Sequence, residues 1–286
     1  LIPSAIGYFN TRVNYDILYY LPSEIETMQG QDILMDDFNK GAYAMVVVQN
    51  MDTKSTDKLI KKVEGVEHVA QVISYTGIVG EDVPSEIVPS KFRKYFENDS
   101  TNTTLFAIFF DNTTSSDDTM NAITQIREQT EGQAFISGMS AVVTDTKNLS
   151  EKETPLYVLI AVVLVCIVLA IFMDSFLVPV FFMISIGMAI VYNLGSNIFL
   201  GEVSYITKAL AAVLQLGVTL DYSIFLWHSY KEMKEQYPDD HKEAMAVAIG
   251  NTLTSVVGSS ITTVAGFIAL CFMSFTLGLD LGIVMA

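Results

Sequence analysis

One short stretch of the sequence combines residue types and spacing that could carry a proton. Asp221 and Tyr222 stand in LGVTLDYSIFLWHSYKE (216–232), within an otherwise apolar run. An ionised carboxylate in a membrane span costs about 2.5–3.5 kcal/mol on insertion scales, so an acid placed there is a functional candidate. Burial favours its neutral form, and such a side chain can load and release a proton. The alternative is an Asp221 that hydrogen-bonds helices together.

The surroundings of this acid in the sequence fit a relay. Gly217 precedes Asp221 by four residues, which places both on one face of a helix. A glycine there admits a neighbouring helix and leaves room for water or a partner side chain. The next apolar segment carries hydroxyls at helical spacing, and these are possible relay partners facing Asp221: Ser255, Ser259, Thr262 and Thr263. Their alternative role is helix packing by small residues.

The distribution of charge shows where these residues stand in the chain. The net charge is −16 and the mean hydropathy is +0.40. Residues 1–154 hold 23 acids and 12 bases, whereas residues 155–286 hold 9 acids and 4 bases. We therefore expect a soluble acidic domain over 1–154 and a membrane domain over 155–286.

Four segments of the second half are long enough for a bilayer span, which takes about 17–25 mostly apolar residues. They are residues 156–173, 176–200, 206–227 and 253–276, and another apolar run starts near 281. Residues 229–250 intersperse charges with apolar positions and predict an amphipathic helix on the cytoplasmic membrane surface, broken at Pro238.

The lysines predict the orientation of these spans. Lys231, Lys234 and Lys242 lie in the segment 228–252, whereas the loop 201–205 has no Lys or Arg. The positive-inside rule then places 228–252 in the cytoplasm. When the spans are counted back from this segment, residues 1–154 are expected outside the plasma (inner) membrane, and the protein crosses that membrane several times. Leu1 is not an initiator Met, and we expect the chain to begin and end partway through a longer protein.

The acidic half alternates strands and helices. Strands are predicted at 42–49, 66–76, 103–110 and 135–137, with helices at 55–63, 85–96 and 116–130. This order predicts an α+β extracytoplasmic domain of the ferredoxin-like (split βαβ) type, followed by an all-α transmembrane helix bundle.

Several classes of function are excluded by what the sequence lacks. No basic stripe is present to neutralise phosphates, so we expect no nucleic-acid partner. Cys166 and Cys271 lie in apolar runs and give neither a disulfide framework nor a zinc spacing. No Ser/His/Asp triad, Walker A loop or metal cluster is recognisable. We therefore expect no enzyme, no cofactor and no metal site, and an ion gradient as the energy source.

The stretch 216–232 resembles the fourth-span signature of the MMPL branch of the resistance–nodulation–division (RND) transporter superfamily, in which Gly-x-x-x-Asp-Tyr precedes a phenylalanine-containing run and a charged helix. Residues 14–38 resemble the segment after the first span, and 241–272 resemble the cytoplasmic helix and the small-residue-rich fifth span. The split βαβ domain matches the porter subdomain. The likeness thus extends from just after span one to the start of span six.

The resemblance implies an export pump for lipids or other hydrophobic compounds, driven by proton flow, with Asp221 as the proton carrier and Tyr222 as its relay neighbour. Its partners would be membrane lipids, the hydrophobic substrate and protons. Family members usually have two halves, each with an Asp-Tyr pair, so the second half would come from the same protein or from another protomer. One departure is Asp174-Ser175, where the family often has Arg-Ser.

Two other functions stay open from the sequence. A lipid- or sterol-sensing membrane protein of the Patched type would share the superfamily fold, and occupied glycans at Asn98, Asn102 and Asn112 would favour it. A Sec-type translocation accessory subunit is the second alternative, although its signature around the fourth-span acid differs from Asp-Tyr-Ser-Ile-Phe.

Overall fold

The chain forms two compact units. The computed structural model describes residues 1–80, 83, 87–173 and 177–286. Residues 22–149 form one unit, here called the sheet unit, and residues 1–21 with 150–286 form the other, here called the helical unit. The division differs from the expected boundary at Thr154/Pro155, because the first 21 residues pack with the long helices.

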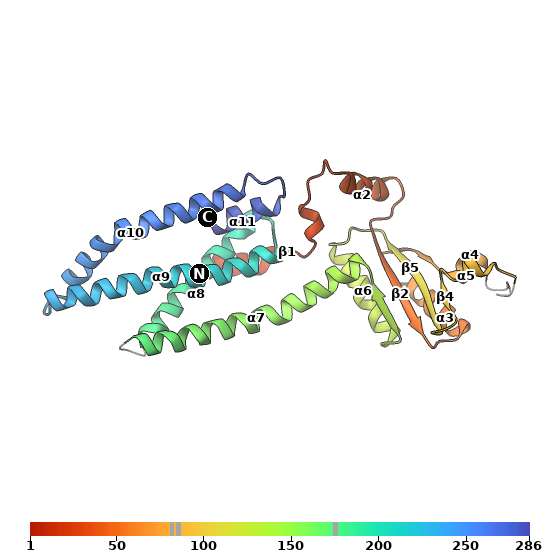
Figure 1. Cartoon of the computed structure of the whole chain (residues 1–286), viewed down its shortest axis with the longest axis horizontal. Coiled ribbons are helices and arrows are strands. Elements are labelled where there is room, and N and C mark those ends of the chain that lie inside the picture. Colours follow the sequence, from red (N-terminus) through yellow and green to blue (C-terminus); the bar gives the residue numbers. More distant parts are fainter. Residues whose placement is uncertain (81–82, 84–86, 174–176) are drawn as a thin grey trace. The chain divides into compact units, whose positions relative to one another are not determined.

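A five-stranded antiparallel sheet is the frame of the sheet unit (Figure 1). The strand β2 (Ala42–Gln49) pairs along its whole length with β5 (Thr103–Phe110). The edge strand β3 (Val69–Ile73) pairs with β5, and β6 (Ala134–Ser137) pairs with β2, which gives the order β3-β5-β2-β6. The two-residue strand β4 (Glu97–Asn98) adds a short pairing to β5.

Two amphipathic helices pack on one face of this sheet. They are α3 (Thr53–Glu64) and α6 (Asp117–Thr130), which begin after side-chain caps from Asp52 and Ser116 respectively. Alternate residues of β2 are buried, as expected for a strand with one covered face. The core of the sheet unit includes the fully buried side chains Val46, Val63, Phe106, Ile108, Phe110 and Ile123.

The strong strands and helices of this unit lie where the sequence predicts them. The strands at 42–49 and 103–110 are confirmed in full. Of the helix expected at 85–96, the described residues show α5 (Ser90–Arg93), and residues 85 and 86 of that prediction lie outside the described residues. Two further short helices, α2 (Glu26–Asp36) and α4 (Tyr75–Val79), complete the unit.

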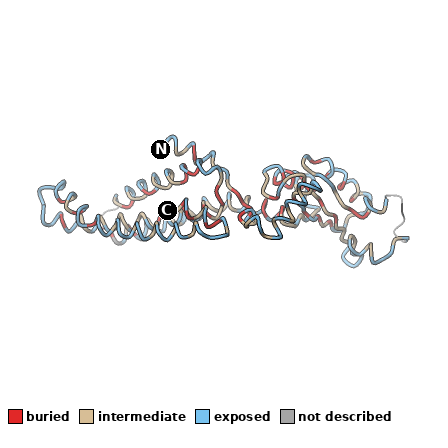
Figure 2. Tube along the Cα trace, turned by 90° about the horizontal axis from the view of Figure 1, so that it is seen from above, coloured by how far each residue is buried: buried red, intermediate tan, exposed pale blue. Residues whose placement is uncertain are grey.

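The helical unit consists of long apolar helices. Its main elements are α7 (Met139–Phe172), α8 (Leu177–Ser196), α9 (Tyr205–Gln236), α10 (His241–Leu270) and α11 (Leu277–Met285). Four segments are long and apolar enough to cross a membrane: Met139–Ile171, Leu177–Leu200, Tyr205–Gln236 and His241–Leu270. Many of their side chains are exposed (Figure 2), which suits contact with lipid.

These helices extend beyond the predicted spans. Helix α7 begins at Met139, well before the predicted start at Leu156, and contains Pro155. Its charged first part stays helical because helix continuity does not require apolar side chains. The predicted start of the second span, Phe176, lies outside the described residues, and the fourth predicted span ends early, because α10 stops at Leu270.

The helix predicted at 229–250 is observed as two pieces, in agreement with the expected break at Pro238. Its two halves continue α9 and α10, which are joined by a turn at 237–240 that contains Pro238. The apolar side chains of the two halves pack against each other, with Met233, Ala244 and Ala248 buried. The two halves therefore pair with each other, and their contact with the membrane surface stays a prediction.

The N-terminal residues are joined to the helical unit. Helix α1 (Ile2–Asn10) packs on α8, with Gly7 directly against Gly195. The strand β1 (Arg12–Asn14) pairs in parallel with β7 (Glu202–Ser204), just after the 3₁₀ helix η2 (Asn197–Leu200) and just before α9.

Hydrogen bonds also join the 3₁₀ helix η1 (Ile17–Tyr20) to the residue before α11. The carbonyl of Tyr20 accepts from the backbone N–H and from the hydroxyl of Thr276, at 3.0 and 2.9 Å.

Candidate functional site

The central helix α9 carries both residues of the Asp-Tyr pair. The helix begins after Ser204, whose hydroxyl accepts a hydrogen bond from the backbone N–H of Ile206. Asp280 strengthens this start, because its Oδ2 accepts from the Ser204 N–H at 2.8 Å and from the Thr207 hydroxyl at 2.6 Å. The pair therefore lies on a well-anchored helix.

Asp221 and Tyr222 point to different sides of α9, because successive residues of an α-helix are about 100° apart. Asp221 is exposed, and within the described parts of the chain it forms no hydrogen bond or ion pair. Gly217, one turn earlier, is also exposed, and no atom lies within 4 Å of where its Cβ would stand. Gly217 and Asp221 thus form an open face on α9.

Tyr222 faces α10. Its hydroxyl donates a hydrogen bond of 3.4 Å to Ser259 Oγ, and Ser260 and Thr263 lie beside the same hydroxyl. Helices α9 and α10 therefore meet through a group of hydroxyls whose protons can be exchanged by rotation.

Of the four hydroxyl residues predicted as relay partners, Ser259 and Thr263 come next to Tyr222. Thr262 and Thr263 both donate to the backbone carbonyl of Ser259, at 2.8 and 3.0 Å, a bond that hydroxyls commonly make within helices. Ser255 lies on α10 as an exposed residue. Two of the four predicted partners thus lie beside Tyr222, the neighbour of the acid, and not around Asp221 as expected.

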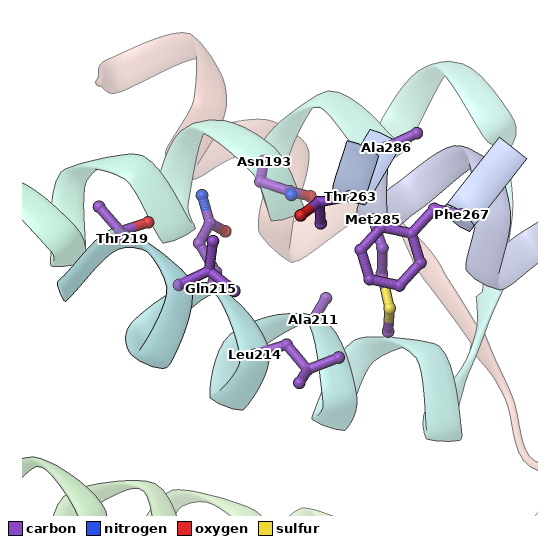
Figure 3. A pocket seen from close by; sticks show the side chains of 10 residues that line it. Asn193, Ala211, Leu214, Gln215, Thr219, Thr263, Phe267, Met285 and Ala286 are labelled. Atoms are coloured by element: carbon purple, nitrogen blue, oxygen red, sulfur yellow. The ribbon is translucent and has the colours of Figure 1, made fainter. Parts of the chain in front are cut away.

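A cavity of about 220 Å³, here called the bundle cavity, lies among α8, α9, α10 and α11 (Figure 3). Its polar lining includes Asn193, Gln215, Thr219 and Thr263. Among the described residues Gln215 Oε1 is buried with no hydrogen-bond partner, whereas Asn193 Nδ2 donates to the Val284 carbonyl at 3.1 Å. The volume is ample for water, which needs polar partners of this kind.

The bundle cavity is connected to the Asp-Tyr pair by shared residues. Thr263 both lines the cavity and lies beside the Tyr222 hydroxyl. Gln215 and Thr219 are not among the residues predicted from the sequence, although Gln215, Thr219 and Tyr222 follow the spacing i, i+4, i+7 that marks one face of a helix. Asp280, at the edge of the last apolar run, is likewise not among them.

The described residues contain no group of three or more His, Cys, Asp or Glu side chains that could hold a metal ion. The side chains at this site are one carboxylate, one phenol and several hydroxyls, which are groups that can bind or exchange protons.

The fold and the site define a multi-span membrane protein with an acid on one of its spans. The sequence pattern of the MMPL family matches residues 20–286, and the chain belongs to this family. Family members are transporters rather than enzymes.

Two relatives are similar to the chain over most of its length. "Putative membrane protein MJ1562" of Methanocaldococcus jannaschii is 23% identical over 251 residues, which cover 82% of this chain and 64% of that protein. "Putative membrane protein SCO5905" of Streptomyces coelicolor is 23% identical over 271 residues, which cover 87% of this chain and 31% of that protein. The chain thus spans less than two thirds of each relative.

Proposed function

We propose that this protein is a transporter that exports lipids or other hydrophobic compounds and is driven by the proton-motive force. The observation that carries the proposal is Asp221, an unpartnered carboxylate on a helix apolar enough to cross a membrane. Because an ionised carboxylate is costly in hydrocarbon, the protonation of Asp221 is coupled to the surroundings of the helix. A helix whose surroundings change with protonation can drive a transport cycle.

The hydroxyls around Tyr222 support a route for the proton. In the proposed cycle Tyr222 exchanges protons with Asp221 on one side and with Ser259 on α10 on the other. The bundle cavity supplies water next to Thr263, and this water extends the route away from the Asp-Tyr pair. Each transfer is between oxygen atoms and needs no metal or cofactor.

The open face of α9 leaves room for another helix to pack beside Asp221. The space beside Gly217 is free, so a helix from the second half of the protein, or from another protomer, can approach Asp221 closely. We propose that this partner covers Asp221 in one state of the cycle and exposes it in another.

The sheet unit fits the role of a substrate-guiding porter domain. Its main elements run β2-α3-β3-β5-α6-β6, and its strand order β3-β5-β2-β6 supports the proposal of a ferredoxin-like split βαβ fold. We propose that residues 22–149 lie outside the plasma (inner) membrane and that the turn between α9 and α10 lies in the cytoplasm. Lys231, Lys234 and Lys242 near that turn support this orientation.

The test is transport by the intact protein in proteoliposomes that carry an imposed pH gradient. NBD-labelled phosphatidylethanolamine reports lipid movement, and pyranine inside the vesicles reports proton movement. Asp221→Asn removes the titratable group and keeps its size, so we expect normal membrane insertion and at least a tenfold loss of both signals. Tyr222→Phe should reduce both signals, because the ring stays and the hydroxyl is lost.

Asp239→Asn is the matched control, since Asp239 is exposed in the turn between α9 and α10, and it should transport like the wild type. Wild-type transport by Asp221→Asn would refute the proposed role of the acid. A wild-type protein that binds lipid or sterol but moves neither lipid nor protons would refute the transport function and favour a Patched-type lipid sensor.

A further inference from the structure

A second pocket, here called the boundary pocket, lies at one end of the helical unit and has a volume of about 160 Å³. It is formed by the N-terminal segment, by α7 around residue 151 and by the first turn of α9. Its polar lining includes Tyr8, Tyr15, Glu151, Thr154, Tyr205 and Lys208. None of these residues takes part in the proposed proton route.

The boundary pocket lies where the sequences of α7 and α9 change from charged to apolar residues. On α7 the last charged residues, Glu151, Lys152 and Glu153, precede the apolar run that begins at Leu156. On α9 Lys208 is in the first turn, and apolar residues dominate the helix beyond it. Lipid phosphates lie at this level of a bilayer, just outside the hydrocarbon.

The pocket holds a positive charge in a defined place. Lys208 Nζ lies 4.7 Å from the centroid of the Tyr8 ring, which is the geometry of a cation–π contact. Within the described part of the chain Lys208 has no carboxylate at ion-pair distance. A ring face orients an ammonium group but does not neutralise it, so the N–H groups of Lys208 remain donors for an anion.

The pocket also holds a negative charge in a defined place. The Tyr15 hydroxyl donates a hydrogen bond of 3.4 Å to Glu151 Oε1. Tyr15 is itself buried, and its ring stacks on that of Tyr205 at a centroid distance of 5.7 Å. The carboxylate is therefore held by a rigid aromatic pair, while Glu151 remains exposed to a ligand.

We propose that the boundary pocket binds the head group of a zwitterionic phospholipid. The lipid phosphate accepts hydrogen bonds from Lys208, and its ammonium group lies against Glu151. The tyrosine rings suit this level, because their apolar bodies face acyl chains and their hydroxyls face the head groups. This binding requires neither a proton gradient nor transport, so it stands independently of the proposed function.

The experiment measures lipid retention by the intact protein in detergent, using native mass spectrometry with defined phosphatidylethanolamine or phosphatidylglycerol. Wild-type protein should retain phosphatidylethanolamine more tightly than phosphatidylglycerol. Lys208→Met keeps the length of the side chain and should weaken retention of both lipids about tenfold or more, the scale of one hydrogen bond to a charged group. Lys208→Arg should restore retention, and Glu151→Gln should abolish only the preference for the zwitterionic lipid.

Lys234→Met is the matched control, because Lys234 is exposed in the last turn of the same helix, and it should leave retention unchanged. Equal loss in Lys234→Met and Lys208→Met, or no loss in Lys208→Met, would overturn the proposal. Displacement of the bound lipid by millimolar inorganic phosphate would also overturn it, since the pocket would then be a site for a free anion. Melting curves of each variant show that the fold is kept.

Discussion

The crossing of α1 and α8 gives a prediction that can be worked from distances. A Cβ built on Gly7 would lie 2.1 Å from the carbonyl oxygen of Gly195, and a Cβ built on Gly195 would lie 2.1 Å from that of Ser4. Both distances are about 1 Å shorter than the closest ordinary C···O contact of about 3.3 Å. The obstructing atoms belong to backbone, so Gly7→Ala must push the two helices apart.

The magnitude follows from two opposing effects. Overpacking of this kind costs about 1–3 kcal/mol, whereas replacing glycine by alanine in a helix gains at most about 1 kcal/mol. We expect a net loss of about 1–2 kcal/mol for Gly7→Ala. At about 2–4 °C per kcal/mol for a domain of 150–250 residues, this loss lowers the melting temperature by about 2–8 °C.

The assay is thermal unfolding of the detergent-solubilised protein. Gly187→Ala is the matched control, because Gly187 is on the same helix α8 and no atom lies within 4 Å of its built Cβ. The control should melt at the wild-type temperature or slightly above it. If Gly7→Ala and Gly187→Ala melt alike, the close packing of α1 on α8 is refuted.

Two further predictions concern the core and the pH dependence of stability. Phe106→Ala empties a fully buried site in the sheet unit and should lower the free energy of unfolding, measured in urea, by about 3–5 kcal/mol. Tyr43→Ala, on the half-exposed face of the sheet, should lower it clearly less. Equal losses of unfolding free energy would contradict the assigned core. Burial raises the pKa of Asp16 above its usual value, against hydrogen bonds from the backbone N–H groups of Leu18 and Tyr19. Because the pKa of Asp16 is higher in the folded state than in the unfolded state, its protonated form stabilises the folded state fully below the unfolded-state pKa of 3.8. This stabilisation is lost as the pH rises through the folded-state pKa of Asp16. Asp16→Asn should therefore gain stability relative to wild type as the pH rises above 3.8. Melting temperatures of the two proteins that change in parallel with pH would contradict burial as the cause.

The sequence predicts those elements whose local pattern matches their burial. The strands at 42–49 and 103–110 are runs of apolar residues in which alternate side chains fill the core, so pattern and packing agree. Helix α7 begins before the predicted start of the first span. Hydropathy indicates where a helix enters an apolar medium, but it does not indicate where the helix itself begins.

The candidate site is predictable only in part for a similar reason. Asp221 is recognisable from the sequence because an acid in an apolar run is unusual. That Tyr222 meets Ser259 depends on how α9 packs against α10, which the pattern within one helix does not contain. The contact between Tyr8 and Lys208 joins residues about 200 positions apart, and no local pattern encodes it.

The pairing of β1 with β7 has a consequence for the order in which the protein is made. The two strands join residues about 190 positions apart, such as Arg12 and Glu202. At a synthesis rate of about 5–20 residues per second, β1 leaves the ribosome about 10–40 s before its partner exists. During that interval the backbone of β1 is an unpaired edge, and its parallel partner becomes available only after the sheet unit, α7 and α8 have been synthesised. The β1–β7 pair can therefore form only after the whole sheet unit has been synthesised, so the first strand of the helical unit waits for its partner longer than any strand of the sheet unit does.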